Sequence, residues 1–390
     1  MRQRVGRLAP FLAGLVIVAA GCGQQAPTAT PSSAPPAATS KPAASAAAAA
    51  PASAKPSAAA SAGASAAVKP AASAGSAAGS AAPSAKPEAT GQFSGGDPNG
   101  SLVRVSYASP AVSEMPYYAA LAQGFFQQQH IKITQYMMPP NVAITALSKG
   151  EIDIVDAPSN AIEGATRGLP FKLIFSAWQR SPWTLVGKQQ FKSIPDLKGK
   201  VIGTNQAGST PYIYLETGLK KAGLTKSDVK IVSSGGTIIT YQNLIAGQVD
   251  AAVVSPPFDA QAELAGFHEI QFLGDLLELP YIGAGSSVPF LTAHHDETVR
   301  FLRALIAANR WIKDHPAETA DLIVKYIGAP PEAAKRSAEK MIPNLWQDTF
   351  EASPLGLQQA LEIQAELTNT KIDLKPEQLV DYGPLHEALR

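Results

Sequence analysis

One pattern of apolar and polar positions occurs twice along the chain and predicts two copies of the same supersecondary unit. Leu147–Val155 and Leu244–Ala252 both consist of a helix end, a glycine, a polar residue and an apolar strand with one aspartate near its start. Gly150 and Gly247 suit the left-handed position that ends a helix, where a side chain would be strained. The strands that follow are apolar at consecutive positions, which is typical of strands covered on both faces.

The likeness extends upstream of both glycines. Each copy begins with a strand (103–108 or 201–204), a polar loop and a helix opened by Pro-Tyr, and continues into a second strand (131–137 or 229–232). Proline in the first turn is a favoured helix start. Two tandem β-α-β-α-β units predict an α/β fold with two facing lobes, whose ligand lies beyond the carboxyl ends of the strands. One continuous sheet with a chance local match is the alternative.

The remaining apolar pattern divides the chain between the lobes. Helical periodicity and helix-opening prolines fill the region after residue 290, so a helical C-terminal tail is expected. If that tail packs on the first lobe, lobe one comprises 101–187 plus 282–390 and is discontinuous, and lobe two comprises 188–281. Two crossings, near 182–192 and 281–287, would then restrict motion to opening and closing.

The N-terminus has the pattern of an export signal, expected to span residues 1–21. Basic residues precede Leu8–Ala20, an apolar stretch shorter than the roughly 20 residues that a bilayer span needs. Ala19-Ala20-Gly21-Cys22 resembles the bacterial lipobox, although Ala19 stands where leucine is commoner. Cys22 is the only cysteine, which excludes an intramolecular disulfide and makes lipidation its expected fate. A signal with an incidental cysteine is the alternative.

Residues 22–100 are expected to form the lipidated cysteine and a disordered tether. The segment is rich in Ala, Ser and Pro and has almost no large apolar side chains, so burial cannot offset its conformational entropy. A lipid anchor followed by such a tether places the folded part outside the cytoplasm, next to the bacterial cell membrane.

Composition and motifs exclude several function classes. The formal net charge of +1 has no basic bias, which argues against nucleic acid as a partner. The two adjacent histidines, His294 and His295, have poor metal-ligand spacing, and neither a metal nor a cofactor is expected. The sequence lacks Gly-x-Ser-x-Gly, His-Glu-x-x-His and phosphate-loop motifs, so no catalytic residue is assigned. Asp153 and Asp250 lie at strand starts, away from the expected cleft, and should be structural.

The candidate ligand-binding residues lie near predicted strand ends and helix starts. Helix starts offer free backbone N–H groups and the positive end of the helix dipole. The candidates are Ser109, Pro110, Tyr117, Pro158, Ser159, Asn160, Trp178 and Arg180 in lobe one, and Gln206, Gly208, Ser209, Thr210, Tyr212, Pro256 and Phe258 in lobe two. The loop 206–210 is the sharpest case, because its glycine permits close approach and its hydroxyls can donate. Helix capping, turn formation, core packing and a solvated arginine are the alternatives.

Four segments resemble one family. Pro116–Phe126 resembles the P-x-Y-x-A-x-x-x-G-F-F helix of the NMT1/THI5-like (nitrate/sulfonate/taurine type) solute-binding proteins of ABC importers. Ala146–Asp153, Ile194–Gly203 and Lys375–Leu389 resemble further segments of that family, so the resemblance covers essentially 101–390. It implies a type II periplasmic-binding-protein fold that closes around a small solute and delivers it to an ABC permease, and a monomer is expected.

The superfamily also contains enzymes. Its yeast pyrimidine-precursor synthases depend on a cysteine-rich motif, which a chain with Cys22 as its only cysteine lacks. The leading hypothesis is therefore a binding protein for a small organic solute, with sulfonate, carboxylate and pyrimidine-like chemistry all open. A sensory or scaffolding protein on the same fold and an extracytoplasmic enzyme are the alternatives.

Overall fold

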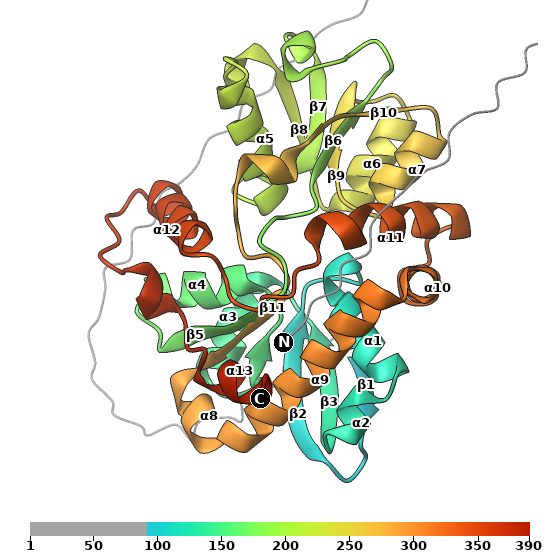
Figure 1. Ribbon diagram of the computed structural model, residues 1–390. Coiled ribbons are helices and arrows are strands. Elements are labelled where there is room, and N and C mark those ends of the chain that lie inside the picture. The colour runs from blue at the N-terminus through green and yellow to red at the C-terminus, as the bar shows by residue number, and fades with distance from the viewer. Residues whose placement is uncertain (1–91) are drawn as a thin grey trace, which may run out of the picture. The chain divides into compact units, whose positions relative to one another are not determined.

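The computed structural model describes residues 92–390, all within one compact unit, Ala82–Arg390 (Figure 1). The signal segment, Cys22 and most of the expected tether lie outside the described residues. The described part is built around two separate sheets, which agrees with the two lobes predicted from the repeat. Among its helices none combines the length and apolarity that a membrane span requires.

Lobe one is built around a six-stranded sheet. Its strands, in spatial order, are β1 (Gln92–Gly96), β3 (Ile131–Met137), β2 (Ser101–Tyr107), β4 (Ile154–Val155), β11 (Gly283–Ser287) and β5 (Phe171–Ser176). β2 runs parallel to β3 and β4, whereas β1 and β11 are antiparallel to their neighbours. The carboxyl ends of β2, β3 and β4 therefore lie at one edge of this sheet.

Lobe two is built around a five-stranded sheet. Its strands, in spatial order, are β10 (His268–Phe272), β6 (Thr184–Gly187), β9 (Ala251–Val254), β7 (Val201–Asn205) and β8 (Lys230–Ser234). β7 is parallel to β8 and β9, and β6 is antiparallel to β9 and β10. Consecutive residues of β9, Val253 and Val254, belong to different apolar clusters, so this strand is covered on both faces as predicted.

Helices cover both sheets. Lobe one carries α1 (Met115–Ala122), α2 (Phe125–Gln128), α3 (Pro140–Ser148), α4 (Pro158–Thr166), α8 (Val288–Ala293), α9 (His295–Asp314), α10 (Pro316–Ile327), α11 (Pro331–Leu345), α12 (Pro354–Thr368) and α13 (Gly383–Ala388). Lobe two carries α5 (Thr210–Lys221), α6 (Thr237–Ile245) and α7 (Phe258–Leu264). Short 3-10 turns occupy Val112–Glu114, Ile194–Leu197, Lys226–Asp228, Leu273–Leu276 and Pro376–Leu379.

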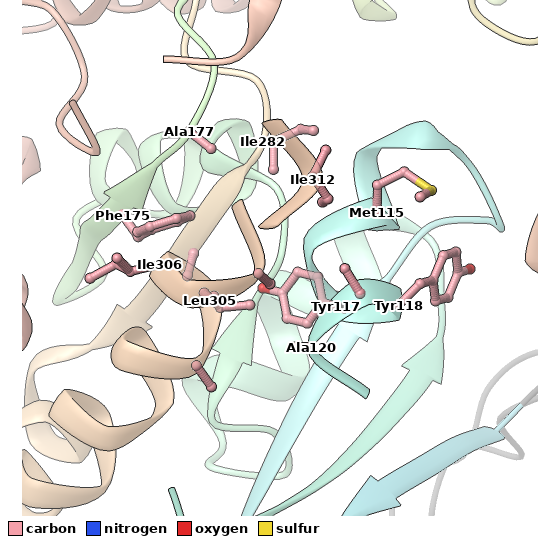
Figure 2. Packing of buried hydrophobic residues seen from close by; sticks show 14 of the residues in the cluster. Met115, Tyr117, Tyr118, Ala120, Phe175, Ala177, Ile282, Leu305, Ile306 and Ile312 are labelled. Atoms are coloured by element: carbon pink, nitrogen blue, oxygen red, sulfur yellow. The ribbon is translucent and has the colours of Figure 1, made fainter. Parts of the chain in front are cut away.

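The helical tail packs on lobe one, as expected. α9 lies against α1 and against β2 and β3. Figure 2 shows Tyr117 of α1 beside Leu305 of α9 within the largest apolar cluster, which also contains residues of α10 and α11. The apolar face of the amphipathic helix α9 therefore forms part of the core of the first lobe.

The repeated segment, Leu147–Val155 and Leu244–Ala252, has the same local structure in both copies. Gly150 and Gly247 have φ of 69° and 72°, which confirms the predicted left-handed helix ends. Asp153 accepts hydrogen bonds from the backbone N–H (2.8 Å) and guanidinium of Arg104, and Asp250 accepts from the N–H of Val201 (3.1 Å). Both aspartates therefore hold the backbone of a neighbouring strand, at Arg104 within β2 and at Val201 where β7 begins, and the structural role expected of them is confirmed.

Two expected boundaries are wrong. β1, which falls inside the segment expected to be tether, pairs with β3 in the sheet of lobe one, so the fold begins before residue 101. β6, expected in lobe one, pairs with β9 and β10 in lobe two, so the first crossing precedes residue 184. The two errors have different causes. β1 has no apolar alternation to mark it as a strand, and only its pairing with β3 places it in the fold. The apolar pattern of β6 does mark it as a strand, but such a pattern does not state which sheet the strand joins.

Candidate functional site

Two carboxyl groups meet at the carboxyl edge of the lobe-one sheet. Glu114 immediately precedes α1, and Asp156 directly follows β4. Both residues are buried, with exposed fractions of 1% and 9%, and their side chains hydrogen-bond to each other. Gln135 Nε2 of β3 and Ser113 Oγ each donate to Glu114 at 3.2 Å. The turn before α1, the loop after β4 and strand β3 therefore converge on one acidic pair.

The pKa values of both carboxyl groups are raised in the folded protein. Burial raises the pKa of Glu114 well above its ordinary value, and the negative charge of Asp156 adds to that effect. Burial likewise raises the pKa of Asp156, to about 6. Within residues 92–390 no lysine, arginine or histidine forms an ion pair with either group. Two adjacent buried carboxyls without a counterion share a proton, because both cannot ionise at once at low cost.

Aromatic side chains from the crossings lie next to the pair. Gly283, two residues after Tyr281, donates its backbone N–H to the carbonyl of Asp156 at 3.3 Å, and Tyr281 donates its own N–H to the carbonyl of Trp178 at 3.1 Å. Burial raises the pKa of the Tyr281 hydroxyl, and the charges of Glu114 and Asp156 raise it further. Tyr281 stacks on Trp178 with ring centroids 6.0 Å apart and meets Trp183 edge-on at 6.4 Å. Trp346, just after α11, contacts Trp178 edge-on at 4.6 Å. The acidic pair and the aromatic cluster are therefore one site at the junction of the lobes.

The aromatic cluster has unused hydrogen-bond donors. The indole Nε1 atoms of Trp178, Trp183 and Trp346 are buried, and none has a partner anywhere in the described part of the chain. A buried N–H without a partner costs about 1–3 kcal/mol, so native structures seldom leave several together. Three such donors on the rings of one aromatic cluster are consistent with a site whose partner is a bound molecule.

A cavity of about 280 Å³ separates lobe two from α11 beside this cluster. Arg180 and Pro182 of the first crossing line it, together with Pro256 and Asp259 of lobe two and Lys340 of α11. Arg180 is already committed, because it pairs with Asp275 and donates to the backbone carbonyl of Asn344 at 2.6 Å. This arginine therefore stabilises the junction and is not a free cation for an anionic ligand.

The lobe-two loop 206–210 has the properties expected of it. Gly208 has φ of 82°, in the region that favours glycine, and Ser209 is the N-cap of α5. The Oγ of Ser209 is buried and forms no capping bond, and it has no hydrogen-bond partner among residues 92–390. The ordinary capping role is thus not used here, and the hydroxyl is available to a ligand.

The candidate residues from both lobes differ in burial. Exposed loop positions are Ser109, Pro110, Ser159, Gln206 and Gly208; half-buried ones are Arg180, Ser209, Thr210, Tyr212 and Phe258; buried ones are Tyr117, Pro158, Asn160, Trp178 and Pro256. Tyr117 donates from its hydroxyl to Gly283 O at 3.2 Å inside the core, so packing occupies this side chain. Phe258 packs on Tyr241, with centroids 5.5 Å apart.

Five residues of the site are absent from the candidate ligand-binding residues: Glu114, Asp156, Trp183, Tyr281 and Trp346. The sequence places Trp183 and Tyr281 near predicted strand ends, where core or hinge packing is the favoured interpretation, and Glu114 at a predicted helix start that should face the cleft. Asp156 also had a signal in the sequence. Asp156 directly follows the first repeated strand, as Ser255 follows the second, and a charge at a strand's carboxyl end points toward the ligand edge.

Comparisons with known proteins agree with this architecture. The family described as NMT1/THI5 like matches residues 112–319. A Haemophilus influenzae protein named for thiamine biosynthesis is 26% identical over 246 residues (57% of this chain, 75% of that protein). The riboflavin-binding protein RibY of Chloroflexus aurantiacus is 23% identical over 233 residues (57% and 65%). A 4-amino-5-hydroxymethyl-2-methylpyrimidine phosphate synthase of Uromyces fabae is 27% identical over 219 residues (53% and 59%).

Solved structures share the two-lobed fold. The periplasmic aliphatic sulphonate-binding protein of Escherichia coli superimposes with a TM-score of 0.61 at 17% identity, covering 74% of this chain and 99% of that one. The periplasmic nitrate-binding protein of Synechocystis PCC 6803 superimposes with a TM-score of 0.57 at 10% identity (75% and 89%). The fold expected from the sequence resemblance is thereby confirmed. The chain belongs to the NMT1/THI5-like family and has the type II periplasmic-binding-protein fold.

Proposed function

We propose that this protein is the solute-binding component of an ABC importer and that its solute is a planar nitrogen heterocycle bearing N–H donors. The observation that carries the proposal is the buried Glu114–Asp156 pair beside the aromatic cluster. A carboxyl pair that shares a proton offers one donor and several acceptor positions, which suits the edge of an aminopyrimidine. Indole and phenol rings supply flat apolar walls with donors at their rims.

The same pair disfavours anionic solutes. A sulfonate or nitrate bound beside Glu114 and Asp156 would face at least one negative charge in a poorly solvated place. Arg180, the cation nearest to the aromatic cluster in sequence, is already neutralised by Asp275. The names of the relatives point the same way, since thiamine biosynthesis, a pyrimidine phosphate and riboflavin all involve flat nitrogen heterocycles. Sulfonate and nitrate appear in the names of proteins that share only the fold.

The partners and location form part of the proposal. A lipid on Cys22 would hold the protein at the outer side of the bacterial cell membrane, where it delivers its solute to the permease as a monomer. Changing Cys22→Ala should release the folded protein from the membrane fraction. Continued sedimentation of the variant with membranes would contradict the lipid anchor and leave the solute assignment untouched.

An enzymatic role is not proposed. One relative is named as a synthase, but the cysteine-rich motif implied for such synthases has no counterpart in a chain whose single cysteine is Cys22. Mass spectrometry of the recovered solute after incubation decides between binding and turnover. A binding protein returns the solute unchanged.

Titration calorimetry with four probes tests the solute class. We expect saturable binding of 4-amino-5-hydroxymethyl-2-methylpyrimidine or riboflavin, and none of taurine or nitrate. Asp156→Asn should weaken heterocycle binding about 10- to 100-fold near neutral pH, because Asp156 has the less strongly raised pKa and carries the negative charge of the pair, and a hydrogen bond to a charged group contributes about 1.5–3 kcal/mol. Asp321→Asn, at an exposed carboxyl, is the matched control and should bind as wild type does. Binding of taurine or nitrate alone would contradict the heterocycle.

The lobe-two contact is tested separately. Ser209→Ala removes a buried hydroxyl that makes no bond inside the described chain, so the melting temperature without solute should stay close to that of wild type. Solute affinity should fall by about tenfold, the equivalent of one hydrogen bond. A folded variant that binds the heterocycle at wild-type affinity would remove this loop from the site.

A further inference from the structure

Helix α11 is a part of lobe one that also contacts lobe two. Ala334, Ala338, Met341 and Leu345 on one side of the helix are buried in the main apolar cluster of lobe one. The helix also packs against α7 of lobe two, and Figure 1 shows it lying beside that helix. Any change in the separation of the lobes must therefore alter the contact between α11 and α7.

The contact is dominated by one ammonium group. Lys340 Nζ lies 3.2 Å from Asp259 Oδ2 and 3.9 Å from Glu263 Oε1, both on α7, and it donates a hydrogen bond to Glu269 of β10. The Asp259 side chain is only 1% exposed, and about a third of the side-chain surface of Lys340 is exposed. A single cation from lobe one thus forms ion pairs with three carboxylates of lobe two.

The three carboxylates have no alternative counterion. In the part of the chain that the structure describes, Lys340 is the only basic residue paired with Asp259, Glu263 or Glu269. Asp259 additionally accepts the backbone N–H of Ala260 at 2.8 Å, which does not cancel its charge. Withdrawing Lys340 would leave the buried Asp259 without a counterion and beside two like charges. A buried charge that loses its partner is far more costly than a broken surface pair.

We propose that Lys340 is an interlobe latch, a positioning residue that holds the lobes together before solute binds. Arg180 strengthens the same junction, because it joins the lobe-two Asp275 to the backbone of Asn344 at the end of α11. A latch that favours the closed form raises solute affinity, since less of the binding free energy is used to bring the lobes together. The inference depends on the two-lobed fold and goes beyond the proposed solute.

Distance measurement by double electron–electron resonance tests the latch without any solute. The chain has one cysteine, so full-length protein carrying Cys22→Ala can be labelled at Lys149→Cys in lobe one and Lys220→Cys in lobe two, both exposed. Labelled protein that retains Lys340 should show one population of short distances between the two labels. In Lys340→Met the longer population should increase at least tenfold relative to the short one, while Lys340→Arg should keep the short population.

The control is Lys335→Met, on the same helix. Lys335 is 64% exposed and its carboxylate partner, Glu339, belongs to α11 itself, so its removal should leave the distances unchanged. Equal distance distributions in wild type and Lys340→Met would overturn the proposal, even if the variant melted at a lower temperature, because the lysine would then be only a stabilising ion pair. Should Lys340→Met fail to fold, Glu269→Gln, at a half-exposed partner, must lengthen the distances in the same direction by a smaller amount, because Asp259 and Glu263 keep their pairing with Lys340, and unchanged distances would equally overturn the latch.

Discussion

The two lobes repeat the same unit at one end of their sheets and differ at the other. At the strand starts, Asp153 and Asp250 bond to the backbone of the residue 49 positions earlier, so the device is the same in both copies. At the strand ends, lobe one has the buried acidic pair of Glu114 and Asp156, whereas lobe two has Ser255 and the free hydroxyl of Ser209. The starts of the strands are constrained by the need to hold the sheet, while the ends are free to specialise for recognition.

The largest expected effect is on the free energy of unfolding and concerns the strand starts, where both lobes use an aspartate. Asp153→Ala removes the hydrogen bonds that bind Arg104 from both backbone and side chain, and should lower the free energy of unfolding by about 3 kcal/mol. Asp250→Ala breaks a more exposed pair with Lys188 and should cost about 1 kcal/mol. Urea denaturation of the two variants measures both values. Equal losses would mean that the two aspartates serve their lobes alike despite their different burial.

A smaller effect concerns the strand ends of lobe one, where the acidic pair should make the stability of the protein depend on pH. The pKa of Asp156 is raised from 3.8 to about 6 in the folded protein, so the native state binds more protons than the unfolded state across that interval. Stability contributed by this group is therefore present at low pH and is lost as pH rises through about 6, by roughly 2–3 kcal/mol. Asp156→Asn should be more stable than wild type at pH 7, and the difference should disappear near pH 4.

Thermal melting between pH 4 and 8 makes this measurement. Asp321→Asn, an exposed carboxyl on α10, is the control and should follow wild type throughout. If Asp156→Asn also followed wild type at every pH, the acidic pair would not titrate in this interval and lobe one would not differ from lobe two in this respect.

The smallest effect should be the same in both lobes. Gly150→Ala and Gly247→Ala place a side chain in the left-handed region, where a Cβ at either position meets no atom within 4 Å. Backbone strain alone then determines the cost, about 1 kcal/mol for each variant. Thermal unfolding should show equal shifts. A large difference between the two would mean that the copies differ at their helix ends as well.

The acidic pair could be predicted only in part. Asp156 stands at the end of a recognisable strand, and Glu114 opens a helix marked by Pro116, so each had a position near the ligand edge. Nothing in the sequence states that these two carboxyls, 42 positions apart, touch one another. Their shared proton arises from that contact and from the water excluded around it, and both depend on packing.

The sequence by itself determined the tandem repeat, the left-handed glycines, the strand-pinning aspartates and the helical tail of lobe one. These features follow from local periodicity and backbone sterics, which operate over a few residues. Tertiary structure alone decided that β6 joins lobe two, that β1 completes lobe one, and that Lys340 reaches Asp259 across 81 positions. The physical reason is that strand pairing and ion pairing between distant segments are selected by the packing of the whole chain, and a local pattern encodes the burial of a residue without naming its partner.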